Sequence, residues 1–178
     1  ALRAFFLSVP LTHCGVAGQF AAIYAVLNHA LDVFTSERGD WRIASDRSPN
    51  QHGDIPMEFG VFILAQQRGY HQTSQQVISN SIEQTVVAEQ AGFDNAWYAE
   101  HHFNNYSLSP SPLMMVAHMA AKTKRIRLGT AVCILPLYHP ARFLAEVGFV
   151  DTVSNGRLDL GIGSGYQEFE FERSLPAQ

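Results

Sequence analysis

Apolar positions along this chain change their pattern at Met57. From there, short apolar runs that suit strands alternate with stretches in which apolar residues recur at helical spacing. The strand-like runs begin near Glu58, Asn95, Arg125 and Arg157. Strands that alternate with helices predict tandem βα units, whose strands are parallel and whose crossovers are right-handed. We therefore expect an α/β fold of about four parallel strands.

The three stretches between these runs carry the signals that begin and end helices. The first pattern stops at Gly92, and the third ends at Asn155 and Gly156, which suit helix C-termini. The second and third helices are expected to begin at Ser111 and His139, each followed by a proline in the first turn. The expected buried faces are Ile78, Ile82 and Val86 in the first helix, Leu113, Val116, Ala117 and Ala120 in the second, and Leu144, Val147 and Val150 in the third.

Residues 1–56 show no comparable alternation. They contain one helix-like stretch, 19–34, and a polar segment, 36–56, that is typical of a loop. The apolar start imitates a signal peptide but has no clear cleavage site, and no apolar run reaches the ~20 residues of a membrane helix. We expect an unassigned N-terminal extension over 1–56, one α/β unit over 57–173 and an atypical tail over 174–178.

Composition narrows the possible functions. With 178 residues, of which 47% are hydrophobic and 16% charged, the chain can bury a real core. A net charge of −4 argues against nucleic-acid binding, and the short basic run from Lys122 to Arg127 suits a helix C-terminus. Cys14 and Cys133 are too few for a disulfide framework or a zinc site, so we expect no metal and a reducing, cytoplasmic setting.

The second strand runs directly into Glu100, His101 and His102. Polar groups at the C-terminal ends of parallel strands face the ligand in barrel enzymes. A histidine there can act as a general base or stabilise an anion, and neighbouring residues are expected to point in opposite directions, one into the site. On local evidence alone, a pair of solvated loop histidines is the simpler interpretation.

Glycines follow the fourth strand at Gly161, Gly163 and Gly165. Bare backbone here would let a phosphate or a flavin ring approach closely, although a tight strand-to-helix turn explains the glycines equally well. As a dinucleotide fingerprint the loop is incomplete. With Asp159, the same segment is similar to the first motif of S-adenosylmethionine-dependent methyltransferases, but there it would open the sheet, whereas here three βα units precede it.

Taken together, four segments resemble the bacterial luciferase-like flavin monooxygenases, in the order and nearly at the spacing of that family. They are Ala99–Phe103, Arg127–Val132, Leu135–Pro136 with His139–Pro140, and Gly156–Gly161. The match runs from Met57 to about Arg173. It implies the N-terminal half of a TIM-type (β/α)8 barrel, whose two open strand edges would favour self-association into a homo-oligomer.

The resemblance also implies an activity: oxygenation of a small organic substrate with molecular oxygen and reduced FMN, the flavin being supplied by a separate reductase. His101 matches the active-site histidine, which acts on the flavin peroxide, and His102 matches its neighbour. The resemblance places the cofactor against Glu100, Ala131, Val132, Gly163, Ser164 and Gly165, with a non-prolyl cis peptide bond between Ala131 and Val132.

Two positions depart from the family pattern. Gly163 stands where some luciferases have a reactive cysteine, and Ser164 where they have a phosphate-binding arginine, which argues against light emission and weakens the phosphate contact. The Ser164 hydroxyl and the Gly165 backbone remain as donors. A deazaflavin in place of FMN, a methyltransferase, and an inactive half-barrel that self-associates stay open as alternatives, and the substrate is not defined.

Overall fold

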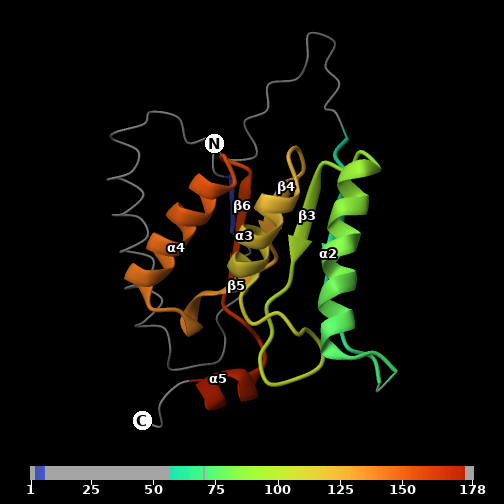
Figure 1. The fold of residues 1–178 in the computed structure, drawn as a ribbon. Coiled ribbons are helices and arrows are strands. Elements are labelled where there is room, and N and C mark those ends of the chain that lie inside the picture. Colours follow the sequence, from blue (N-terminus) through green and yellow to red (C-terminus); the bar gives the residue numbers. More distant parts are fainter. Residues whose placement is uncertain (1–2, 7–56, 70, 175–178) are drawn as a thin grey trace.

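The computed structural model describes residues 3–6, 57–69 and 71–174, and these form one parallel sheet with helices (Figure 1). The strands lie in the order β1-β6-β4-β3-β2, with the short β5 paired to β6. Their bounds are β1 (Arg3–Phe6), β2 (Gly60–Ile63), β3 (Asn95–Tyr98), β4 (Arg127–Thr130), β5 (Cys133–Ile134) and β6 (Leu158–Gly163). The predicted parallel α/β architecture is confirmed.

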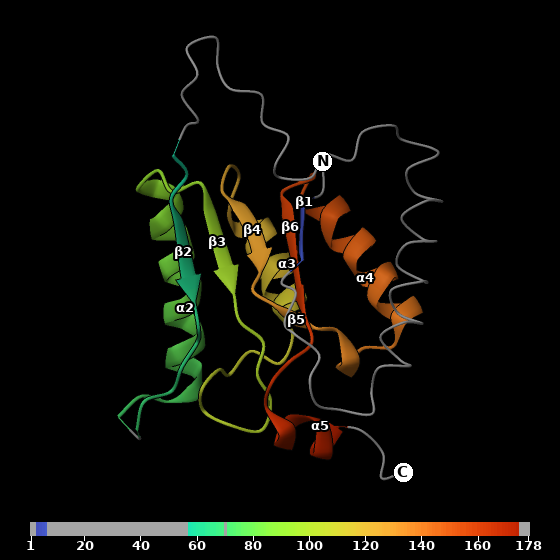
Figure 2. The same ribbon diagram turned by 180° about the vertical axis from the view of Figure 1, so that it is seen from behind.

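Three of the described helices lie on one face of the sheet, and a fourth, short helix follows the last strand. They are α2 (Ser74–Gln90), α3 (Pro112–Lys122) and α4 (Pro140–Val153), with the 3-10 turn η1 (Leu135–Leu137) before α4 and the short α5 (Glu168–Ser174) after β6. Figure 2, viewed from behind, shows the strands in front of α2, α3 and α4. Both views place α5 beyond the C-terminal ends of the strands, which is where the predicted site residues lie.

Local capping signals explain where the helices begin. Thr73 and Gln76 form a capping box before α2, because each side chain accepts a hydrogen bond from the other residue's backbone N–H. Ser111 caps α3 and a proline follows it, as predicted, and His139 occupies the same position before α4. Gly92, just past α2, has a φ of +91°, a conformation that glycine adopts without steric cost.

The buried face of α2 differs from the prediction. Its buried residues are Val77, Ser81, Thr85 and Ala88, whereas Ile82 and Val86 are only partly buried. Polar residues can face the core here because their hydroxyls are satisfied locally: Ser81 donates to the Val77 carbonyl at 2.9 Å and Thr85 to the Ser81 carbonyl at 3.1 Å. Apolar spacing alone therefore predicts a buried face of α2 that is shifted by one residue from the observed face.

Strand β1 adds an edge strand that the sequence pattern does not predict. Residues Arg3–Phe6 pair in parallel with Asp159–Ile162 of β6, so this edge of the predicted half-barrel is covered. Part of the unassigned segment 1–56 thus belongs to the sheet. With β5 as well, the sheet has more than the four strands expected. The helix-like stretch 19–34 lies outside the described residues.

The two faces of the sheet have different surroundings. Side chains on the helix-covered face, such as Ile63, Tyr98 and Leu128, are buried in the core together with residues of α3 and α4. A row of paired residues occupies the opposite face: Phe62, Trp97, Gly129 and Asp159. Phe62 is 57% exposed, and none of the described helices covers this second face (Figure 2).

Candidate functional site

The loop after β3 carries a buried carboxylate that joins three segments. Glu100 is 3% exposed, and its Oε1 lies 2.8 Å from Nε2 of His102. Its Oε2 accepts hydrogen bonds from the backbone N–H of Ile134 at 3.0 Å and from the hydroxyl of Tyr138 at 2.7 Å. A buried carboxylate needs such donors, and here they hold the loop after β3 against β5 and η1.

A second carboxylate holds the other histidine. Nδ1 of His101 lies 3.0 Å from Oε1 of Glu170, which also accepts the backbone N–H of His102 at 2.8 Å. Glu170 comes from α5 and is fully buried. Its Oε2 is buried as well and has no hydrogen-bond partner among the described residues. The position of His101 therefore depends on the helix that follows the glycine loop.

The alternation of side chains along a strand predicts that one histidine faces the site and that the other packs or hydrogen-bonds behind it, but this alternation does not set their positions. Strand β3 ends at Tyr98, so the alternation of side chains along a strand has stopped before His101 and His102. Each ring is instead held by its own carboxylate. The interpretation as solvated loop histidines also fails, because His101 is 9% exposed.

Burial and hydrogen bonding shift the pKa values of three titratable side chains at this end of the sheet. The hydrogen bond that the His102 ring donates to Glu100 raises the pKa of His102 above its ordinary 6.5, although burial opposes the shift. Burial raises the pKa of Tyr138, so this phenol keeps its proton. Burial also raises the pKa of Cys133 to about 12, so this buried thiol stays protonated and unreactive.

Aromatic rings flank His101 on its accessible side. The ring of Tyr106 lies 4.9 Å from the imidazole, centroid to centroid, and that of Tyr166 lies 6.1 Å away, both edge-on. Tyr106 is 45% exposed and Tyr166 73%. The histidine thus sits at the inner end of an aromatic surface that a planar ligand can contact.

The predicted cofactor-binding backbone lies at the same end of the sheet. The Ala131–Val132 peptide bond is cis, as the resemblance implied. A Cβ added at Gly163 would lie 2.8 Å from Cγ2 of Val132, so these two segments are in direct contact. Gly163 also pairs in register with Ile134, the residue whose N–H binds Glu100.

The remaining loop residues are placed less tightly. Ser164 is half-buried, and its hydroxyl donates to the carbonyl of Gly165 at 3.4 Å. Gly165 has a φ of +74°, and a Cβ there would lie 2.5 Å from the ring of Phe171. All the predicted site residues, from Glu100 to Gly165, therefore lie where β3, β4 and β6 end.

Sequence reasoning missed the groups that hold the histidines: Glu170, Tyr138 and the N–H of Ile134. It also missed Tyr106 and Tyr166. The one local signal for Glu170 is its place between Phe169 and Phe171, since an acid flanked by aromatic residues in a short helix is poorly suited to a solvated surface. Nothing near Tyr138 in the sequence marks it.

Asp159, the acid of the methyltransferase-like motif, has a different role. Both of its oxygens accept hydrogen bonds from Arg127, at 2.9 Å from Nε and 2.6 Å from Nη2. The aspartate is almost fully buried by this bidentate ion pair on the open face of the sheet. It does not point to a nucleoside at the C-terminal ends of the strands.

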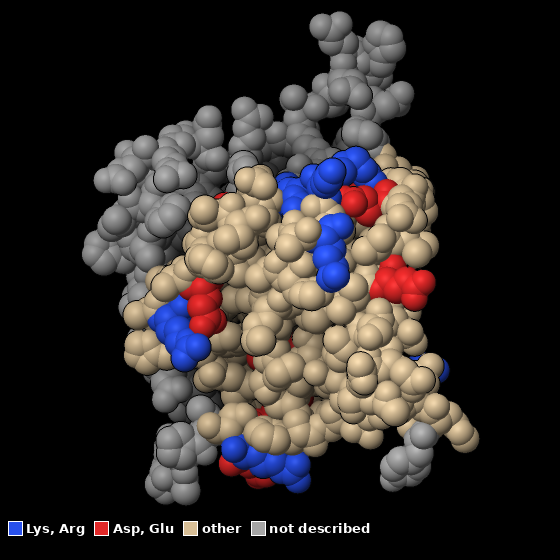
Figure 3. Space-filling view, in the orientation of Figure 1, with Lys and Arg blue, Asp and Glu red and all other residues tan. Residues whose placement is uncertain are grey.

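Most basic side chains lie away from the site, but Arg173 of α5 lies over the rings of Phe103 and Phe169. Figure 3 shows few charged residues across the helix-covered face, with lysine and arginine gathered mainly at the edge opposite α5. Arg125 there donates to the carbonyls of Glu89 and Phe93 at the end of α2, which confirms the interpretation of the basic run. Within the described part of the chain, none of the helices is long and apolar enough to cross a membrane.

Comparisons with known proteins agree with this geometry. The sequence pattern of luciferase-like monooxygenases matches residues 57–176. The chain is 73% identical over 117 residues to the uncharacterised protein y4vJ of Sinorhizobium fredii, with 66% of this chain and 33% of that protein aligned. It is 38% identical over 120 residues to the oxygenase component of the flavin-dependent trigonelline monooxygenase of Acinetobacter baylyi, covering 67% and 33%.

A solved structure gives the same result. The oxygenating constituent of 3,6-diketocamphane monooxygenase from Pseudomonas putida, in complex with FMN, is similar with a TM-score of 0.63 and 27% identity. The similarity covers 67% of this chain and 33% of that one. The chain spans about a third of the length of the curated relatives it matches. By sequence and by fold, it belongs to the family of luciferase-like monooxygenases.

Proposed function

We propose that this chain provides the flavin-binding end of a monooxygenase that uses reduced FMN and molecular oxygen to oxygenate a small organic substrate. The observation that carries the proposal is one cluster at the strand ends. His101, held by Glu170, lies at the same end of the sheet as the Ala131–Val132 peptide and the bare backbone of Gly163. Family membership supplies the class of reaction.

The residues present suit a flavin. Gly163 and Gly165 leave room for no side chain of their own, since a Cβ there would meet Val132 or Phe171, so the loop stays slim at this end of the sheet. Oε2 of Glu170 is a buried acceptor that a ligand N–H or O–H would satisfy. Ser164 and the N–H of Gly165 would lie toward the phosphate. Bound reduced FMN would supply the electrons that activate oxygen.

His101 would hold or transfer a proton in this reaction. Because Glu170 occupies Nδ1, the nitrogen left for a ligand is Nε2. The imidazole ring that carries it is flanked by the rings of Tyr106 and Tyr166. This follows the usual arrangement in which a carboxylate orients the histidine that performs acid–base chemistry. Glu170 would act as a positioning residue, and His102 would supply a second charge nearby.

The partners are proposed with the function. The relative from Acinetobacter baylyi is named an oxygenase component, and we propose that this chain likewise receives reduced flavin from a separate reductase. The homo-oligomer and the cytoplasmic setting stay predictions. Deazaflavin stays the alternative cofactor.

An anaerobic titration with reduced FMN tests the proposal directly. We expect the 178-residue chain to bind the flavin more tightly than His101→Ala or Gly163→Arg, because these changes remove the proton-bearing ring or fill the backbone surface. The matched controls are His118→Ala, an exposed residue of α3, and Gly148→Arg, where an added Cβ meets nothing within 4 Å. Equal affinity for all five proteins would refute the assignment.

The methyltransferase alternative is not favoured, because Asp159 is engaged by Arg127. A thermal-shift comparison separates the two functions. Reduced FMN should raise the melting temperature of the chain, and S-adenosylmethionine should leave it unchanged. The reverse result would favour the methyltransferase.

A further inference from the structure

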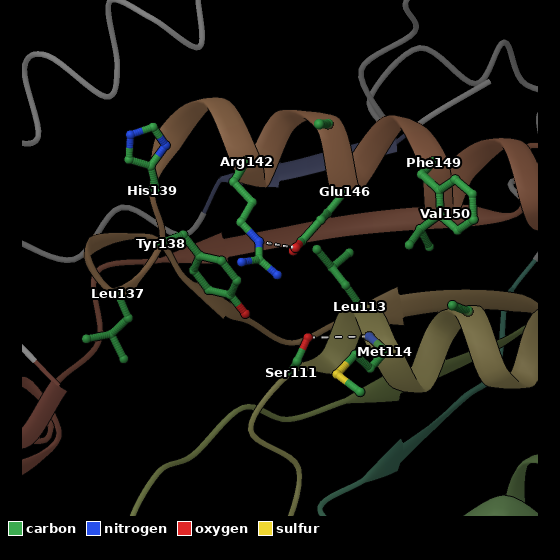
Figure 4. A pocket seen from close by; sticks show the side chains of 12 residues that line it. Ser111, Leu113, Met114, Leu137, Tyr138, His139, Arg142, Glu146, Phe149 and Val150 are labelled. Atoms are coloured by element: carbon green, nitrogen blue, oxygen red, sulfur yellow. Dashed lines mark hydrogen bonds and ion pairs between the residues drawn. The ribbon is translucent and has the colours of Figure 1, made fainter.

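Tyr138 lies between the histidine loop and a groove on the helix-covered side of the sheet. The groove has a volume of about 770 Å³ and lies between α3 and α4, and the ring of Tyr138 forms part of its wall (Figure 4). The hydroxyl of the same residue donates to Oε2 of Glu100 at 2.7 Å. One side chain thus faces the groove and also contacts the carboxylate that holds His102.

The direction of this hydrogen bond is fixed. Burial, together with neighbouring Cys133 and Glu100, raises the pKa of Tyr138 above its ordinary 10, so the phenol keeps its proton at neutral pH. Glu100, as a carboxylate, can only accept. The Tyr138 hydroxyl is therefore a permanent donor to Glu100.

Tyr138 and His102 share the charge of one carboxylate. Glu100 has three donors in the structure: the Ile134 N–H and the Tyr138 hydroxyl on Oε2, and the His102 ring on Oε1. A donor that stabilises a carboxylate reduces the attraction that this carboxylate exerts on its other partners. The charged groups that face His102 are Glu100, from its own loop, and Glu170, from α5.

We propose that Tyr138 sets the protonation of His102 through the carboxylate of Glu100, which both side chains contact. In this arrangement Tyr138 is a positioning residue: it does not touch a ligand at the strand ends, and it acts through Glu100 on the charge that His102 presents there. The inference rests on the proposed function only in one respect, that the charge of His102 serves the proposed reaction.

Titration of the histidine by NMR tests the inference in the flavin-free chain. Tyr138→Phe removes the hydroxyl and keeps the ring, so Glu100 loses one of its donors and attracts the His102 proton more strongly, and we expect the pKa of His102 to rise by about half a unit. Tyr98→Phe is the matched control, because it removes another buried hydroxyl, bonded to Thr85 at 3.0 Å. The His102→Gln spectrum assigns the signal.

The Glu100→Gln variant shows whether Tyr138 changes the pKa of His102 through Glu100. In Glu100→Gln, the pKa of His102 should fall, and adding Tyr138→Phe should produce no further change. The inference is overturned if Tyr138→Phe leaves the titration unchanged or lowers the pKa, if Tyr98→Phe has the same effect, or if the shift persists without Glu100. Because no flavin is present, this outcome is independent of the flavin titration.

Discussion

At the level of single residues, each of the two adjacent histidines has its own carboxylate, and the carboxylates come from different parts of the chain. Glu100 lies two residues before His102, whereas Glu170 is separated from His101 by 69 positions. Both acids are buried, so each is costly unless its oxygens are hydrogen-bonded. Removing either acid should affect the folded chain as well as the histidine that it holds.

Glu170→Ala is expected to lower the free energy of unfolding by about 1–3 kcal/mol, because the backbone N–H of His102 loses its acceptor. Denaturation with urea measures the loss. Glu168→Ala is the control, since Glu168 is an exposed acid on the same helix and should tolerate the change. Equal stability of the two variants would show that the bond to His102 contributes nothing.

The raised pKa of His102 makes the stability of the folded chain depend on pH. Its folded-state pKa lies above its ordinary 6.5, so the folded chain binds this proton more tightly than the unfolded chain does. The contribution is fully present below about pH 6.5 and is lost as the pH rises through the folded-state pKa. Urea midpoints measured from acid to alkaline pH should fall more for the parent chain than for His102→Gln. His118→Gln should follow the parent curve.

At the level of elements, arginine side chains join the helix ends to the sheet. Arg157 donates to the carbonyl of Ala120, to the carbonyl and hydroxyl of Thr123, to the carbonyl of Ile126 and to the carbonyl of Ser154. These acceptors lie where α3 and α4 end and where β4 is about to begin. A planar guanidinium can reach several acceptors that a single ammonium cannot.

Arg157→Lys should therefore lower the free energy of unfolding by about 1–3 kcal/mol, since several buried carbonyls lose their donor. Chemical denaturation monitored by circular dichroism measures the change. Arg142→Lys is the matched substitution on an exposed helix face, where Arg142 forms an ion pair with Glu146, and we expect no measurable effect there. If both lysine variants have the same free energy of unfolding as the parent, the hydrogen bonds of Arg157 do not stabilise the packing of these elements.

The elements differ in how far their sequence determines them. The starts of α3 and α4 were predictable, because a capping residue and a proline act on the adjacent turn. The contacts of Glu170 and Tyr138 were not, because each depends on segments more than thirty residues away that only the folded sheet brings together. The buried face of α2 was misplaced because serine and threonine can satisfy their own hydroxyls within a helix.

At the level of the whole molecule, the sheet has helices on one face and an N-terminal strand on one edge. Neither feature follows from the alternation of apolar residues, because strand pairing is non-local. The resemblance identified the family and the strand-end site, but it runs from Met57 onward, so it contained no information about β1. Residues Arg3–Phe6 nevertheless extend the sheet beyond β6.

Removal of residues 1–6 should increase self-association, because the backbone groups of β6 would then lie at an open edge. Sedimentation velocity over a range of concentrations measures this. Removal of residues 1–2 alone leaves β1 in place and is the control. If both shortened chains sediment like the parent, pairing with β1 does not protect the edge.

The position of Trp97 gives the molecule an intrinsic optical reporter. Its indole lies against Gly129, on the face of the sheet that the described helices leave open, and donates a hydrogen bond to Asn95 at 2.9 Å. The fluorescence emission of an indole shifts when water is excluded from its surroundings. Trp41 is the one other tryptophan in the sequence and would contribute to the same signal. In a Trp41→Phe variant, the emission wavelength of Trp97 would therefore report whether polypeptide covers that open face.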